Sequence, residues 1–275
     1  MARSGNPYIG RKPKLKPSVV AYVDIVGYKQ LVEKAYKKGK AEEFLKKLHH
    51  ALKESHEHVD PGHANVFHSV RKPDFSAFSA FTDNIVIGYP TQFFGEEELG
   101  QAFRELSRFQ MRLAINGFFV RGGISMGDLY MDDMVVYGPA LFEAIEAERS
   151  LARDPRIVLA NSAREKVDEH LKYYAVPAHA QHVTDLRKDA DGQYFVNYLN
   201  TVVPGEWYFS ENELEKHKLA IEDKLTQYEG EPRIYSKYLW SAAYHNYFCD
   251  NCPSLGVRMK IDIKNFMVAI RLIIE

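Results

Sequence analysis

The first regular hydrophobic pattern along the chain covers residues 18–24 (SVVAYVD). Its members are apolar and mostly β-branched, which is typical of a buried strand, and Gly27 marks the turn that follows it. Apolar residues then recur at helical spacing, first from Tyr28 and again over residues 44–52. This part of the chain therefore predicts a strand, a turn and two helices.

The middle of the chain begins with a predicted hairpin. Aromatic and small residues alternate over residues 75–81 (FSAFSAF), and residues 85–89 form a second apolar run. The turn residues between them place Asp83 at the hairpin tip. The elements predicted next are a helix over 99–113, strands over 118–126 and 129–137 that meet at Gly127-Asp128, a helix over 141–151 and a strand over 156–160.

This order, β-α-α-β-β-α-β-β-α-β, predicts an α+β fold. We expect an antiparallel-rich mixed sheet with helices packed on one face. Beyond about residue 200, a charged pattern over 211–228 and an aromatic-rich pattern over 234–248 predict helices instead of strands. The predicted organisation is an extended arm over 1–17, a main domain over 18–200 and a mainly helical extension over 201–275.

Composition narrows the function classes. The chain has 275 residues, of which 45% are hydrophobic, and 36 basic against 37 acidic residues give a net charge of −1. A dedicated nucleic-acid binder usually carries a clear basic excess, so no nucleic-acid substrate is expected. The basic block at residues 11–17 (RKPKLKP) contains two prolines, and we interpret it as a solvated, extended arm.

Neither a membrane segment nor a secretory signal is expected from the sequence. No run of about 18 apolar residues is present, and the first 18 residues lack an apolar segment. Cys249 and Cys252 are the two cysteines, too few for a disulfide framework, which favours a cytoplasmic location. With His245 they make an incomplete zinc pattern, so free thiols are predicted, a metal or redox role being the alternative.

Two aspartates are the first candidates for chemistry. Asp24 ends a buried strand just before a glycine turn into a helix, and Asp83 lies at the hairpin tip. Carboxylates placed so can hold divalent cations against a triphosphate, while backbone N–H groups contact its phosphates. The alternatives are a helix N-cap for Asp24 and a plain turn residue for Asp83. Together the pair favours a metal site.

Several segments, in this order, resemble the motifs of class III nucleotidyl cyclases. They are residues 22–28 (YVDIVGY), Thr82-Asp83, residues 120–128 (VRGGISMGD) and residues 138–148 (GPALFEAIEAE), within a region of about 18–165. The resemblance implies a class III cyclase-like (ferredoxin-like or palm) sheet. It also implies two Mn²⁺ or Mg²⁺ ions per site, bound by Asp24, Asp83 and the backbone of Ile25. The phosphates would be bound by the turn formed by Ile25, Val26, Gly27 and Tyr28.

Departures from the family pattern point to the substrate. Ser79 stands where the family has a purine-selecting Lys or Glu, and Val135 where it has an Asp or Cys. In these respects the chain is similar to the bacterial pyrimidine cyclases of Pycsar antiphage defence. That resemblance implies a homodimer with composite active sites that converts UTP, or alternatively CTP, to the cyclic monophosphate and pyrophosphate as an antiviral signal. Ser79 and Thr82 are then expected to line the base pocket.

A second set of departures concerns catalysis. Phe142 and Glu146 stand where the family has an Asn and a charge-stabilising Arg. Arg121 or Arg149 could replace that arginine, the alternatives being a surface ion pair and a helix-end cation. The same departures leave open a catalytically silent, dimeric nucleotide-binding module. The retained aspartate pair counts against it, because two carboxylates would repel a triphosphate without metal.

Overall fold

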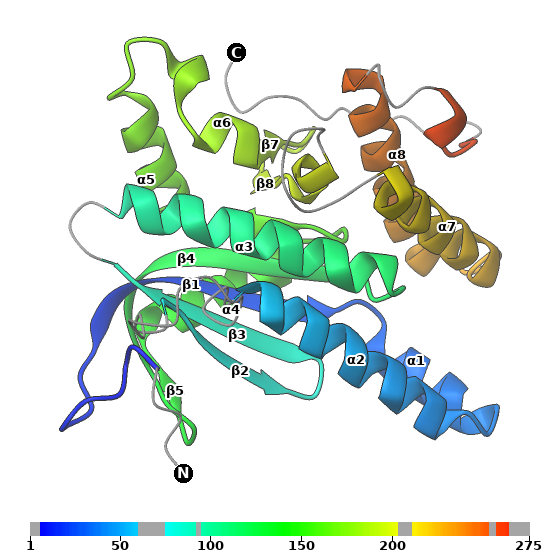
Figure 1. Ribbon diagram of the computed structural model, residues 1–275, viewed down its shortest axis with the longest axis horizontal. Coiled ribbons are helices and arrows are strands. Elements are labelled where there is room, and N and C mark those ends of the chain that lie inside the picture. The colour runs from blue at the N-terminus through cyan, green and yellow to red at the C-terminus, as the bar shows by residue number, and fades with distance from the viewer. Residues whose placement is uncertain (1–5, 60–74, 92–94, 203–210, 253–256, 264–275) are drawn as a thin grey trace, which may run out of the picture.

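The computed structural model describes residues 6–59, 75–91, 95–202, 211–252 and 257–263. Its strands form one eight-stranded sheet in the order β2-β3-β1-β4-β6-β8-β7, with β5 paired to the end of β4 (Figure 1). The strands are β1 (Lys16–Ile25), β2 (Ala77–Phe81), β3 (Asn84–Pro90), β4 (Val120–Met131), β5 (Val136–Tyr137), β6 (Ile157–Leu159), β7 (Leu186–Lys188) and β8 (Tyr194–Val196). Only β4 and β6 pair in parallel, so the described sheet is mixed and mostly antiparallel, as predicted for an α+β fold.

Helices cover both faces of this sheet. They are α1 (Tyr28–Lys37), α2 (Ala41–Val59), α3 (Glu96–Ile115), α4 (Pro139–Leu151), α5 (Asn161–Leu171), α6 (His182–Asp185), α7 (Glu211–Gln227) and α8 (Pro232–Asn251). In Figure 1, α2 and α3 cross in front of the central strands, whereas α4 lies behind them. The expectation of helices on one face is therefore wrong. A parallel β4–β6 pair needs a crossover connection, and α4 is the helix within it.

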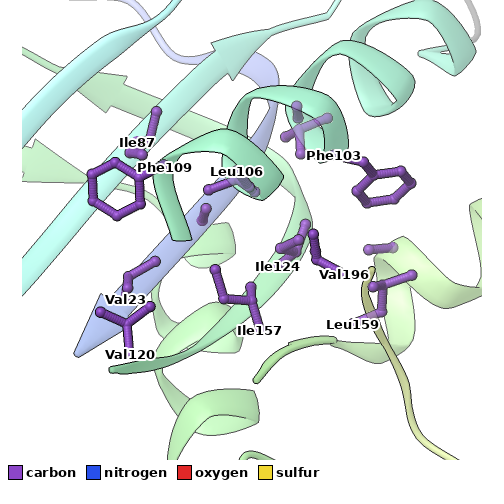
Figure 2. Close-up of a cluster of buried hydrophobic side chains, with 14 of the residues drawn as sticks. Val23, Ile87, Phe103, Leu106, Phe109, Val120, Ile124, Ile157, Leu159 and Val196 are labelled. Atoms are coloured by element: carbon purple, nitrogen blue, oxygen red, sulfur yellow. The ribbon is translucent and has the colours of Figure 1, made fainter. Parts of the chain in front are cut away.

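The main core lies between α3 and the sheet. Figure 2 shows Phe103, Leu106 and Phe109 of α3 against the side chains of Val23 and Ile124, and all five are fully buried. Burying side chains of this size stabilises the fold by about 1.5–3 kcal/mol each. This face is therefore a dry, apolar layer.

The opposite face of β1 and β4 is different. Every second residue of β1, including Tyr22 and Asp24, points toward the side where α4 packs. The helix approaches closely at Gly123, where an added Cβ would lie 2.2 Å from the carbonyl oxygen of Ala144. Only a glycine fits there, so the sheet holds α4 at short range beside the polar end of β1.

The predicted hairpin at Gly127-Asp128 is wrong. Both residues continue the ladder, because Gly127 pairs with Ser18 and Asp128 with Pro17 of β1. The chain reverses four residues later, where Asp132 Oδ1 accepts hydrogen bonds of 2.8 Å from the N–H groups of Met134 and Val135. Gly127 and Asp128 are common turn residues, but they do not end β4 because their backbone pairs with β1.

The C-terminal helices are confirmed, and they share a core with the sheet. Trp240 and Tyr244 of α8 pack against Phe195 of β8, with ring centroids 5.4 Å from it in both cases. The three-residue strands β7 and β8 and helix α5 were not predicted. A division of the chain near residue 200 remains a prediction.

The N-terminal segment is partly anchored. Residues 11–15 are exposed, as expected of a solvated arm, but Tyr8 is buried and its hydroxyl lies 2.7 Å from Ser18 Oγ. Among the described helices, none has both the length and the apolar character that crossing a bilayer requires.

Candidate functional site

The antiparallel pairing of β1 and β3 places Asp24 opposite Asn84, beside the hairpin tip that carries Asp83. The backbone N–H of Ile25 donates to the carbonyl oxygen of Asp83 at 3.2 Å. Burial raises the pKa of Asp24, and the neighbouring Asp83 carboxyl raises that pKa further, while Arg121 opposes the rise. The two candidate metal ligands are therefore side by side, although they are 59 positions apart in the sequence.

The hairpin tip is strained. Among the described residues, Thr82 is the only non-glycine with a positive φ, 59°. A β-branched side chain is disfavoured in this left-handed region. The Thr82 hydroxyl lies 2.8 Å from Asp83 Oδ1, so the strained residue helps to hold the orientation of that carboxylate.

The donor set suits a hard divalent cation. Asp24 and Asp83 offer carboxylate oxygens, which Mg²⁺ and Mn²⁺ prefer, and their mutual repulsion would be relieved by a cation. The described residues contain no group of three or more His, Cys, Asp or Glu side chains that could hold a metal. Mg²⁺ is commonly held by one or two carboxylates together with substrate phosphates, and two carboxylates meet that requirement.

The turn after β1 opens helix α1. Gly27 is its N-cap in a left-handed conformation (φ 72°), and the helix has no side-chain cap hydrogen bond and no acidic residue in its first turn. Asp24 is therefore not an N-cap. The N–H groups of Ile25 and Val26 donate to Asp83 and Phe119 within the fold. Any phosphate contacts of this turn would come from Gly27, Tyr28 and the next residues of α1.

Arg121 of β4 pairs directly with Asp24 of β1. Its Nε–H donates to Asp24 Oδ2 at 3.0 Å, and the same nitrogen lies 2.8 Å from Glu148 Oε1 of α4. Burial raises the pKa of Glu148, while Arg121 lowers it and Asp24 raises it. One cation thus stands between two carboxylates at the polar end of β1.

Of the two arginines considered from sequence, only Arg121 is in contact with Asp24. Arg149 is exposed near the end of α4, and so are Phe142 and Glu146. Helix α8 adds a second cation that sequence reasoning did not select. Burial and Arg121 lower the pKa of half-buried Lys237, whereas Asp154 and Asp24 raise it.

Ser79 lies on the same face as Asp24. It pairs with Val86 of β3, which pairs with Tyr22 of β1. The Tyr22 hydroxyl donates to Asn84 Oδ1. Burial, with Asp24 next, raises the pKa of Tyr22 to about 12, so this hydroxyl stays protonated near neutral pH.

Tyr22, Asn84 and Glu148 were not predicted to take part in the chemistry. From the sequence, Tyr22 is a strand residue and Asn84 a turn residue. Their contact depends on the β1–β3 register, which the local sequence does not give. Glu148 is one of three glutamates of α4, and it is the buried one. Val135 is exposed in the turn between β4 and β5.

No protein-family model matches the chain, and no curated protein matches it. Among solved structures, the crystal structure of the guanylyl cyclase Cya2 is similar over 56% of this chain and 79% of its own, with 14% identity and a TM-score of 0.41. A class III adenylyl cyclase-like ATP-binding protein from Pseudomonas aeruginosa is similar over 57% of this chain and 37% of its own, with 12% identity and a TM-score of 0.38.

Proposed function

We propose that this chain is a nucleotidyl cyclase that converts UTP, or else CTP, to the 3′,5′-cyclic monophosphate and pyrophosphate. The observation that carries the proposal is the pairing of Asp24 and Asp83 beside the N-terminus of α1. Two carboxylates next to a helix end without acidic residues suit a metal-bound triphosphate. By its resemblance to pyrimidine cyclases, the cyclic product would act as an antiviral signal.

The reaction joins two parts of one nucleotide. The ribose 3′-hydroxyl loses its proton and attacks the α-phosphorus in line, and pyrophosphate leaves. Mn²⁺ or Mg²⁺ held by Asp24, Asp83 and the Ile25 backbone would supply charge neutralisation and acidify the hydroxyl. The N–H groups that open α1 would orient the leaving phosphates.

The choice of a pyrimidine rests on the residues at the two positions where the cyclase family reads a purine. Neither Ser79 nor Val135 carries a charge, so neither can make the charged contact to a purine edge that the cyclase family uses. Ser79 offers a small hydroxyl group on the same face as Asp24. Thr82 would contribute a second hydroxyl at the hairpin tip.

We also propose that the working form is a homodimer with the site between subunits. Large apolar side chains are exposed on the α4 helix, the β2–β3 hairpin and the β4–β5 arm. They are Phe142 (66% exposed), Phe81 (78%), Met134 (94%) and Tyr137 (61%). A partner subunit that packed over them would remove this apolar surface from water.

A silent nucleotide-binding module is the second candidate. It is favoured by α4, where exposed Phe142 and Glu146 provide no cation for the transferring phosphate. In that case the protein would bind nucleotide without turning it over.

A substrate panel tests the proposal. Purified protein with Mn²⁺ and ATP, GTP, CTP or UTP should yield cyclic UMP or cyclic CMP, detected by mass, and Asp24→Ala should reduce turnover at least about a thousandfold. Asp223→Ala, an exposed aspartate of α7, is the matched control and should retain activity. A cyclic purine product would refute the base assignment. No product from a folded dimer would favour the silent module.

A further inference from the structure

We propose that Arg121 and Glu148 form a positioning pair that controls whether Asp24 is free to bind a metal ion. Arg121 holds Asp24 in the metal-free protein and turns to Glu148 when a cation takes Asp24. This inference rests on the proposed function, since it takes Asp24 as a metal ligand.

The geometry at Arg121 Nε carries the proposal. This nitrogen has a single hydrogen, which is donated to Asp24 Oδ2 at 3.0 Å. Glu148 Oε1 lies even closer, at 2.8 Å, yet it has no hydrogen-bond partner among the described residues. Two carboxylates thus compete for one N–H, which points at Asp24 Oδ2 and leaves the nearer Glu148 Oε1 without it.

The two acceptors differ in their surroundings. The Glu148 side chain is 8% exposed, and its helix is held against the sheet by the close approach at Gly123. Asp24 is 17% exposed and Arg121 29%, so these two groups face the open side of the site. Glu148 is therefore the fixed acceptor, and Arg121 needs only a small rotation to exchange Asp24 for it.

A buried acceptor without a hydrogen bond is costly, and the exchange removes that cost. When a cation binds Asp24, the released N–H satisfies Glu148. The apparent metal affinity is reduced by the fraction of molecules in which Asp24 is held by Arg121. Glu148 raises the competent fraction, and Arg121 lowers it.

The test measures Mn²⁺ binding directly, from the electron paramagnetic resonance signal of free Mn²⁺ during a titration without nucleotide. Arg121→Met should tighten Mn²⁺ binding about fivefold, because Asp24 is freed. Glu148→Gln should weaken it by a similar factor of about five. In the double variant, Glu148→Gln should change affinity by less than about twofold relative to Arg121→Met, because Glu148 acts through Arg121.

The double variant separates this inference from simple charge effects. Equal weakening by Glu148→Gln with and without Arg121 would overturn it, as would Arg121→Met without tighter binding. Glu146→Gln removes the same charge from an exposed position of α4 and should leave affinity unchanged. If Arg121→Met does not fold, Arg121→Gln with and without Glu148→Gln makes the same comparison. If Asp24→Asn leaves the Mn²⁺ affinity unchanged, the proposed metal site itself is refuted.

Discussion

Two arginines of this fold each sit between two carboxylates, and they are used differently. Arg156 is 1% exposed and donates from both terminal nitrogens, to Asp189 and to Asp191. Trp240 of α8 donates to Asp189 Oδ2 at 2.7 Å, so this cluster joins β6, the β7–β8 hairpin and α8. Arg121, by contrast, is partly exposed and offers one N–H to two acceptors.

The difference separates a structural cluster from a candidate functional one. Around Arg156 each carboxylate accepts hydrogen bonds, and Arg156 and Asp189 are buried while Asp191 is 45% exposed. Arg156 Nε alone has no hydrogen-bond partner among the described residues. Around Arg121, Glu148 Oε1 has no hydrogen-bond partner among the described residues, and it lies next to Asp24, which the Asp83 carboxyl group repels. Unmet polar groups at an accessible strand end are typical of sites that await a ligand.

Breaking the enclosed cluster should have the largest effect on stability. Arg156→Met leaves Asp189 buried without its cation and should lower the free energy of unfolding by about 3–5 kcal/mol. Urea denaturation followed by circular dichroism measures this loss. Arg121→Met should cost less, since Arg121 and Asp24 are partly exposed and only Glu148 is left buried without this cation. Equal losses in the two variants would remove the distinction between the clusters.

Acid should affect two buried histidines and the buried Glu148 in opposite directions. Burial lowers the pKa of His182 and of His245 to about 4, so their contribution to stability is full above the unfolded pKa of about 6.5 and is lost as pH falls toward 4. Burial raises the pKa of Glu148, whose destabilising effect at neutral pH therefore decreases as pH falls.

We expect the protein to lose about 2 kcal/mol for each of His182 and His245 between pH 7 and pH 5. Glu148→Gln removes the opposing contribution, so the loss in that variant should be larger. Urea denaturation of both proteins at the two pH values measures the difference. A smaller loss in Glu148→Gln would contradict the raised pKa of Glu148.

The smallest expected effect concerns the hairpin tip. Thr82→Gly removes the left-handed strain of a β-branched residue and should raise the free energy of unfolding by up to about 1 kcal/mol, after the entropic cost of glycine. It also removes the hydroxyl beside Asp83 Oδ1, so Mn²⁺ affinity should not improve. Thermal denaturation compares the variant with wild type, and Thr226→Gly in α7 is a control that should destabilise. If Thr82→Gly is less stable than the wild type, the backbone at Thr82 is not strained.

The sequence predicted those features that local patterns encode. The buried strand ending at Asp24 and the hairpin tip at Asp83 followed from β-branched runs and turn residues, and the helices from their apolar spacing. The same reasoning failed at Gly127-Asp128, where pairing with β1 overrides the turn signal. Three-residue strands such as β7 and β8 are too short to show a period.

The partners within the site were harder to predict, because they depend on register and helix placement. Nothing in the local sequence says that Arg121 lies opposite Asp24, or that α4 crosses the far face of the sheet. Nothing in the local sequence distinguishes Glu148 from the other two glutamates of α4. Its role follows only from the approach of α4 to β4.

The close packing at Gly122 and Gly123 has a consequence for how the protein tolerates change. A Cβ at Gly122 would lie 2.5 Å from the carbonyl oxygen of Tyr22, and one at Gly123 2.2 Å from that of Ala144. These two positions set the spacing between β1, β4 and α4, and hence the distance at which Asp24, Arg121 and Glu148 meet. These two glycines carry no reactive atom, yet they fix the distances between the charged groups of the site. An alanine at either position would shift β1, β4 or α4 and so change those distances without altering any of the charged residues.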